Sequence, residues 1–373
     1  MKAFAEFFKR EFILVIAGAA ALVSCMLVPV TNYINYIDTD TIGLLFCLMI
    51  AVAGFRESSV LAFLSGKLLG RGKGKTRKTG MILVFISFFT ALFFTNDVAL
   101  IAFVPITAAL FANHKKTMSY VIILQTAAAN LGSMLPPFGN PQNLYLYSHY
   151  EMSPKEFFGT TVPVFVFGGL LIFLLCLFIK NEPMDAESRS DVKLSKKSYI
   201  IMYGILFVLC LLSVFKVLDV IVVFASVCVV AIIIDPNLFV GVDYGLLLTF
   251  GFFFIFVGNI SSIPAVRGFT QHLVSGREMS AAVIVSQFIS NVPTAVMLSG
   301  FTENAEALVL GTNIGGLGTV IASLASVISF RVYMETEDAK PLRYLVAFSL
   351  INFGLLAVIY AFSEKILPML RFA

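Results

Sequence analysis

Long apolar runs separated by short polar segments fill most of this 373-residue chain. A helix that crosses the hydrocarbon core of a membrane needs about 20 mostly apolar residues. Runs of this kind predict nine spanning segments, at residues 12–30, 41–56, 118–149, 157–180, 198–216, 218–235, 243–259, 306–332 and 341–363. The pattern therefore predicts an all-α polytopic membrane protein with about nine full spans.

The first apolar run, 12–30, follows the basic residues Lys2, Lys9 and Arg10. A secretory signal peptide has a shorter apolar core, of about 7–15 residues, and a cleavage site of small residues. We therefore interpret this run as the first span and expect the N-terminus on the cytoplasmic side.

Two further apolar stretches, 79–112 and 278–303, are interrupted near their middles by polar residues. The first interruption is Thr95-Asn96-Asp97, and the second is Ser290-Asn291 followed by Val292-Pro293-Thr294. Each arm holds about 11–16 residues, which at a rise of 1.5 Å per residue is too short to cross a membrane comfortably. We predict two re-entrant hairpins whose tips lie near the middle of the membrane.

The positions of the basic residues support this arrangement of spans and re-entrant hairpins across the membrane. They flank the first hairpin on both sides, within 71–78 and at Lys115 and Lys116, so both of its ends should be cytoplasmic. With the N-terminus inside, the nine spans and two hairpins place 20 of the 26 Lys and Arg residues on the cytoplasmic side. The second hairpin then enters from the outer side. We expect a multi-pass protein of the cell membrane.

The two halves of the chain carry the same order of elements. In each half a span is followed by an amphipathic segment (57–70 or 260–275), a hairpin, a broken span and a final span. The polar linker 181–197 separates the halves 1–180 and 198–373, and the extra helix at 198–216 inverts the second half. Matching irregular segments in an inverted repeat mark the binding site of many transporters.

The broken spans supply the second part of each predicted site. Segment 118–149 is interrupted by Pro136-Pro137-Phe138-Gly139-Asn140-Pro141-Gln142-Asn143, and segment 306–332 by a Gly-rich run from Gly311 to Thr319. Irregular backbone survives at membrane depth only where it lines a cavity or is buried in protein. The alternative is a set of packing kinks, but four paired interruptions favour a binding site, with candidate residues Thr95, Asn96, Asp97, Gly139, Asn140, Asn143, Ser290, Asn291, Thr294, Gly311, Thr312 and Asn313.

Composition narrows the class of protein. Hydrophobic residues make up 59% of the chain and charged residues 13%, against about 25% charge in soluble domains. The basic residues lie in loops, so we expect no nucleic-acid partner, and the five cysteines and three histidines form no ligand spacing, so we expect no cofactor. No H-E-x-x-H, G-x-S-x-G or Walker A sequence occurs, so we expect neither an enzyme nor a nucleotide-driven pump.

The broken helices define what the site can hold. Helix N-termini favour an anion, whereas unwound carbonyls together with Asn, Ser and Thr oxygens suit a hard cation such as Na⁺. No Lys or Arg lies within the hairpin tips or the breaks. An anionic substrate would therefore be held by dipoles, Asn and hydroxyl groups, and a neutral polyhydroxy substrate remains open.

Asp97 is the one carboxylate in these polar interruptions. A carboxylate at mid-membrane is costly and marks function by default, so Asp97 is a candidate proton or cation coupling site. The alternative is a helix cap that bonds to backbone N–H groups. Outside these interruptions, we expect Arg56 and Glu57 to form an interfacial ion pair at the end of a span.

Four motifs resemble the ion transporter superfamily, which includes arsenite permeases, sodium/proton antiporters, citrate transporters and divalent anion/sodium symporters. They are Phe94-Thr95-Asn96-Asp97-Val98-Ala99-Leu100, Gly139-Asn140-Pro141-Gln142-Asn143, Ser290-Asn291-Val292-Pro293-Thr294-Ala295-Val296 and Gly311-Thr312-Asn313-Ile314-Gly315-Gly316. The resemblance covers most of the chain. It implies a homodimer in which a transport domain moves like an elevator against a scaffold.

The resemblance also implies cation sites at the two tips. By motif, Na⁺ ligands would be Thr95, Asn96 and Gly139 at one tip, and Ser290, Asn291 and Gly311 or Thr312 at the other. The first tip reads Thr-Asn-Asp where the symporters have Ser-Asn-Thr, which favours proton coupling there.

We therefore predict a secondary active transporter of a small carboxylate or inorganic oxyanion, coupled to H⁺ or Na⁺, whose other partner is membrane lipid. The alternatives are an arsenite efflux permease or a Na⁺/H⁺ antiporter, and, in a different class, a passive anion channel.

Overall fold

A computed structural model describes residues 11–28, 33–61, 63, 74–184 and 197–366. Within these ranges the chain is almost entirely helical, and the only β-type pairing is an isolated bridge between Lys75 and Pro183. The prediction of an all-α polytopic membrane protein is confirmed. The predicted linker 181–197 and the amphipathic segment 57–70 lie largely outside the described residues.

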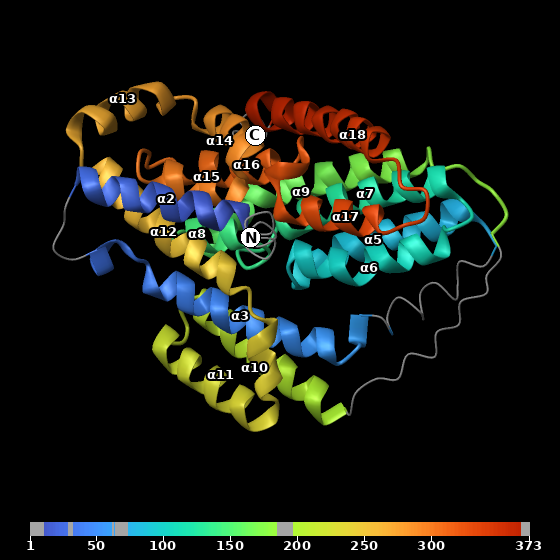
Figure 1. The fold of residues 1–373 in the computed structure, drawn as a ribbon, viewed down its shortest axis with the longest axis horizontal. Helices are drawn as coiled ribbons and strands as arrows, with labels where there is room; N and C mark the ends of the chain where they lie inside the picture. Colours follow the sequence, from blue (N-terminus) through green and yellow to red (C-terminus); the bar gives the residue numbers. More distant parts are fainter. Residues whose placement is uncertain (1–10, 29–32, 62, 64–73, 185–196, 367–373) are drawn as a thin grey trace, which may run out of the picture.

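One group of helices, which we call the frame helices, packs around α3. The group comprises α2 (Phe12–Leu27), η1 (Tyr33–Tyr36), α3 (Thr39–Glu57), α10 (Lys197–Val214), α11 (Val220–Ile234), η2 (Pro236–Gly241), α12 (Tyr244–Ser261) and α13 (Pro264–Val274). α10 and α11 pack on α3, and α2 packs on α12. In Figure 1, α3, α10 and α11 form the lower part of the molecule.

The remaining helices, which we call the hairpin helices, form the other group. They are α5 (Thr76–Phe93), α6 (Asn96–Leu110), α7 (Lys115–Ser133), α8 (Pro141–His149), α9 (Pro154–Cys176), α14 (Glu278–Ile289), α15 (Asn291–Ser299), α16 (Ala305–Gly315), η3 (Val320–Ala322), α17 (Leu324–Met334), α18 (Pro341–Ala361) and η4 (Phe362–Ile366). The two groups meet where α3 touches α6 and α8 and where α12 touches α15 (Figure 1).

Helix length modifies the predicted count of spans. Among the described residues, six helices are long and apolar enough to cross a membrane by themselves: α3, α5, α9, α10, α12 and α18. Five of them match predicted spans, while α2 and α11 are shorter apolar helices and the two remaining predicted spans are the broken pairs.

The sixth helix of spanning length, α5, is an arm of the first predicted hairpin. Its 18 residues exceed the arm length expected from the sequence. The prediction was wrong here because the helix begins at Thr76, inside the basic flank, where a hydrogen bond from the Thr76 N–H to the Glu182 carbonyl (3.0 Å) anchors its start. The other three arms have 15, 12 and 9 residues.

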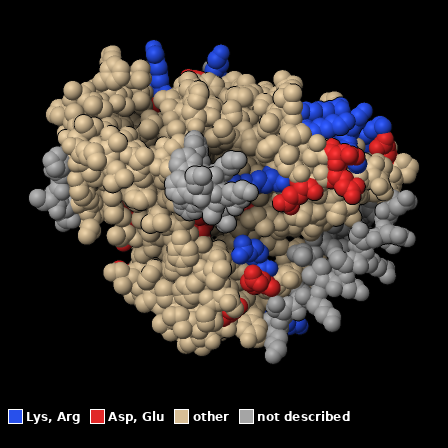
Figure 2. Space-filling view, in the orientation of Figure 1, with Lys and Arg blue, Asp and Glu red and all other residues tan. Residues whose placement is uncertain are grey.

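Both ends of the first hairpin lie at one end of the molecule. The Thr76 hydroxyl donates to the Lys180 carbonyl (2.5 Å), and His114, just before α7, bonds to the Glu182 carboxylate at 3.1 Å. Lys115 and Asp338 form an ion pair at the same end. Figure 2 shows Lys and Arg gathered there with acidic residues beside them. The start of α5, the start of α7 and the end of α9 therefore share one face.

Candidate functional site

The first hairpin turns at Phe94 and Thr95, which are both extended, and α6 begins at Asn96. The buried Asn96 side chain donates from Nδ2 to Asn130 Oδ1 (2.9 Å) and accepts from the Asp97 N–H (3.0 Å). An amide that both donates and accepts in a buried site fixes the position of the turn. The tip is thus tied to the last turn of α7.

The second hairpin turns at the single residue Ser290, whose φ is +74° and ψ is 156°. Its buried hydroxyl donates to the Ala322 carbonyl (3.4 Å), and its own carbonyl accepts from the Thr294 hydroxyl (2.8 Å). A side chain at this φ and ψ is strained, and such strain clusters at functional sites. This tip is therefore held in a costly conformation by its surroundings.

The two helix breaks meet through three amide side chains, which we call the amide triad: Asn140, Asn143 and Asn313. Asn140 Nδ2 donates to Asn313 Oδ1 (3.0 Å), and Asn313 Nδ2 donates to Asn143 Oδ1 (2.6 Å). Asn140 also caps α8 by accepting from the Asn143 N–H (2.9 Å). Residues predicted from the first and second halves of the sequence therefore lie in one buried network.

Two residues of this region were missed by the sequence reasoning. Asn130 on α7 accepts from Asn96 and from the Ser323 hydroxyl (3.0 Å), so it joins the first tip to the second break. Gln287 on α14 donates to the Gly315 carbonyl (2.8 Å) and accepts from the Thr319 N–H (2.9 Å). An amide within an otherwise apolar helix is the signal that could have identified both.

Glycine is required at two positions of the second break. A Cβ on Gly316 would lie 2.9 Å from Asn291 Nδ2. Gly318 has φ +103°, and a Cβ there would lie 2.3 Å from Gln287 Oε1. Only glycine tolerates both a positive φ and a position with no room for a Cβ. The break can therefore pack closely against the second tip and α14.

A cavity of about 770 Å³ lies between the frame helices and the hairpin helices. Four predicted site residues line it: Thr95, Asp97, Asn140 and Ser290. The other eight (Asn96, Gly139, Asn143, Asn291, Thr294, Gly311, Thr312 and Asn313) lie behind this wall. Gly139 and Gly311 serve close packing, since a Cβ would lie 2.1 Å from the Ser133 carbonyl oxygen and 2.7 Å from Ala282, respectively.

Two arginines that are not among the predicted site residues, Arg56 and Arg331, also line the cavity. The expected ion pair between Arg56 and Glu57 was wrong, because no such contact exists between these two described residues. Consecutive residues of a helix do not face each other. Arg56 turns instead toward η2, where a Cβ on Gly241 would lie 3.1 Å from its Nη2 atom.

The described residues contain no group of three or more His, Cys, Asp or Glu that could hold a metal ion. The polar oxygens at the tips come from hydroxyls, amides, carbonyls and the Asp97 carboxylate, which are ligand types of hard cations.

The sequence is similar to known transporters along most of its length. A model of the citrate transporter family matches residues 8–306. An uncharacterised transporter of Methanocaldococcus jannaschii is 31% identical over 95% of this chain and 97% of its own length. The inner membrane protein YbiR of Escherichia coli is 30% identical over 79% of this chain and 80% of its own.

A more distant relative is a silicon efflux transporter of rice, 26% identical over 50% of this chain and 39% of its own length. The family match covers well over half of the chain, including both hairpin tips and the first helix break. The chain therefore belongs to the citrate transporter family and is a multi-pass membrane transporter.

Proposed function

We propose that the protein is a secondary active transporter that moves a small carboxylate or inorganic oxyanion and couples its movement to H⁺ or Na⁺. The observation that carries this proposal is the cavity wall on which three helices begin. The residues that precede α6, α8 and α15 are Thr95, Asn140 and Ser290, and all three line the cavity.

Helix N-termini carry unsatisfied N–H groups and about half a positive charge each. Three of them directed at one cavity favour an anion. The Asn140 side-chain oxygen already accepts a hydrogen bond from the Asn143 N–H, whereas the side chains of Thr95 and Ser290 do not cap their own helices. The Asp97 N–H already bonds to Asn96 Oδ1 and Pro293 has no N–H, so the other N–H groups of these two first turns are the ones available to a bound anion.

The coupling ion would bind at the same tips. Asp97 lies in the first turn of α6 and lines the cavity, so it can exchange a proton or bind a cation there. Na⁺ would use oxygens of Thr95, Asn96 and Gly139 at one tip and of Ser290, Asn291 and Thr312 at the other. In the described structure the Thr312 hydroxyl donates to the Leu308 carbonyl (2.7 Å), which leaves its oxygen free to accept or ligate.

Transport would follow an elevator motion of the hairpin helices along the frame helices, within a homodimer in the cell membrane. The interface between the two groups includes apolar ring contacts, such as those of Phe55 with Phe94 and of Tyr145 with Phe254. An interface of this kind can slide. The hairpin helices, in contrast, are held to one another by the hydrogen bonds of the amide triad and of Asn130. The N-terminus would lie on the cytoplasmic side, with the basic end of the first hairpin.

Two related activities remain alternatives of the same class: efflux of arsenite, and exchange of Na⁺ for H⁺. The silicon efflux relative also keeps a neutral hydroxyl-rich solute in consideration. A passive anion channel is the alternative from a different class, and it differs because it cannot accumulate substrate against a gradient.

Uptake into proteoliposomes tests the proposal. With imposed H⁺ or Na⁺ gradients, citrate, succinate, sulfate or arsenate should accumulate inside above the external concentration. Collapse of the gradient with an ionophore should abolish the accumulation. Flux that only equilibrates the anion would favour a channel, and the absence of binding or flux for every anion would overturn the proposal.

A further inference from the structure

Arg56 and Arg331 stand on opposite walls of the cavity. Arg56 is in the last turn of the frame helix α3, and Arg331 is in the last turn of the hairpin helix α17. Phe55, which precedes Arg56, packs its ring against Phe94 (centroids 5.1 Å apart), so the end of α3 lies beside the first hairpin tip.

Each arginine ends a stripe of apolar residues that faces the cavity. On α3 the lining residues are Leu45, Leu48, Met49, Val52, Ala53 and Arg56, and on α17 they are Leu324, Val327, Ile328 and Arg331. Spacings of three and four residues keep each series on one helix face. The two helix faces that carry the arginines are therefore otherwise apolar, and low-dielectric walls focus the field of a charge that lies on them.

Neither arginine has an ion-pair partner among the residues that the structure describes. The carboxylates of the lining belong to helix starts: Glu11 before α2, Asp97 in the first turn of α6 and Asp243 before α12. Asp243 accepts from the Leu246 N–H (2.9 Å). The C-terminal dipole of a helix offsets only about half a charge, so positive charge remains at both arginines.

We propose that Arg56 and Arg331, on the two walls of the cavity, form a second anion subsite in addition to the helix starts at the hairpin tips. The subsite takes one carboxylate or oxyanion group of the substrate from the cytoplasmic side. Because one arginine belongs to each helix group, a bound anion bridges the two groups before it passes to the tips. This inference rests on the proposed function and adds the residues that capture the substrate.

Anion binding to purified protein tests the subsite. The probes are citrate, succinate and sulfate, and the measurement is the dissociation constant by calorimetry or thermal shift at low and physiological ionic strength. Arg56→Gln and Arg331→Gln should each weaken binding of the responsive probe about tenfold, the usual weight of one charge-assisted hydrogen bond. The salt dependence of binding should fall in both variants, and Arg→Lys should restore part of the affinity.

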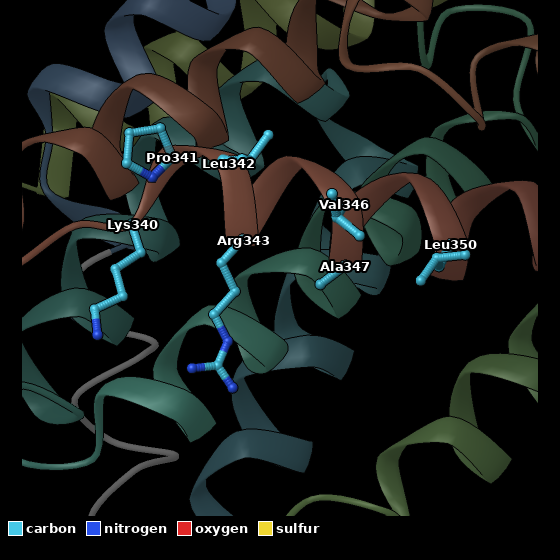
Figure 3. A pocket seen from close by; sticks show the side chains of 7 residues that line it. All are labelled: Lys340, Pro341, Leu342, Arg343, Val346, Ala347 and Leu350. Atoms are coloured by element: carbon cyan, nitrogen blue, oxygen red, sulfur yellow. The ribbon is translucent and has the colours of Figure 1, made fainter.

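Arg343 provides the matched control. It is an exposed arginine near the start of α18 and lines a separate groove of about 570 Å³ on the outer face of that helix. Figure 3 shows its side chain there beside Lys340, with Leu342, Val346 and Leu350 along the helix. Arg343→Gln should leave the dissociation constant unchanged.

The outcomes separate the subsite from the proposed function. If wild-type protein binds an anion and either Gln variant keeps the wild-type constant, the two-sided subsite is wrong and the transporter proposal stands. If wild-type protein neither binds nor moves any of the three anions, the proposed function fails and the subsite with it. Should a Gln variant fail to fold, the Lys variants decide: wild-type affinity and salt dependence in Arg→Lys support a charge-based subsite, and complete loss of binding in folded Arg→Lys protein contradicts it.

Discussion

The two hairpins reverse the chain in different ways, although each places an Asn at the start of its second arm. The first uses two extended residues, Phe94 and Thr95, between arms of 18 and 15 residues. The second uses Ser290 alone, at φ +74°, between arms of 12 and 9 residues. Only the first tip carries a carboxylate, Asp97.

The difference separates two tasks that one binding site must perform. The second tip is fully buried at Ser290 and strained, which suits rigid positioning of a ligand by a fixed backbone. The first tip has unstrained backbone at its turn and presents a titratable group to the cavity. We expect the coupling step to depend on the first tip and the geometry of binding to depend on the second.

The largest expected effect is at Asp97. Asp97→Asn keeps the size of the side chain but removes its charge and its capacity to exchange a proton. Uptake should then lose its dependence on the H⁺ or Na⁺ gradient, so that substrate only equilibrates across the proteoliposome membrane. Asp235→Asn is the control, because Asp235 caps η2 and is not part of the cavity lining. Unchanged gradient dependence in Asp97→Asn would assign Asp97 to capping alone.

The second prediction concerns Asn313, through which the two halves of the sequence meet in the amide triad. Its substitution should affect transport coupling less than Asp97→Asn does, but it should lower the stability of the protein strongly. Asn313→Ala removes the acceptor of Asn140 and the donor to Asn143, and a buried polar group left without a partner costs about 1–3 kcal/mol. The melting temperature in detergent should fall clearly. Asn237→Ala, at an exposed loop amide, should change stability by less than about 0.5 kcal/mol. Equal melting temperatures for the two variants would show that the triad is not a structural joint.

The strain difference between the tips gives an intermediate effect. At Ser290, Gly should be more stable than Ala by about 1 kcal/mol, because the backbone region there is close to glycine-only. At Thr95, where φ is −78° and ψ is 158°, the order should reverse, because glycine only adds unfolded-chain entropy. Thermal melts of the four variants measure both differences. The same order of stability of the Gly and Ala variants at both tips would contradict the difference in backbone strain.

The smallest effect concerns the outer end of the first hairpin. The hydrogen bond from Lys180 lowers the pKa of the Glu182 carboxyl below its usual value. A carboxyl with a lower pKa when folded stabilises the protein above its unfolded pKa of about 4.3, and this stability is lost as the pH falls through the folded value. Glu182→Gln should flatten that part of the melting profile slightly. If the low-pH part of the melting profile is unaltered, the contact between Lys180 and Glu182 contributes nothing measurable to stability.

The motifs at the tips and breaks were predictable because Gly, Pro and Asn interrupt a helix, and at membrane depth an interruption persists only where it lines a cavity or is buried in protein. The full length of α5 was not predictable, because its first turn lies in a basic segment that has the composition of a loop. Asn130 and Gln287 were missed because an amide in a helix does not reveal its partners, and their roles depend on carbonyls and hydroxyls far away in the sequence.

By itself, the sequence determined the class of protein, the helices and the polar interruptions, because these follow from local hydropathy and from the backbone limits of Gly and Pro. Only the tertiary structure decided which interruptions meet in the amide triad and which four of the predicted site residues face the cavity. It also brought Arg56 and Arg331 to that cavity. Contacts between residues far apart in the chain depend on how whole helices pack, and that information is absent from any local pattern.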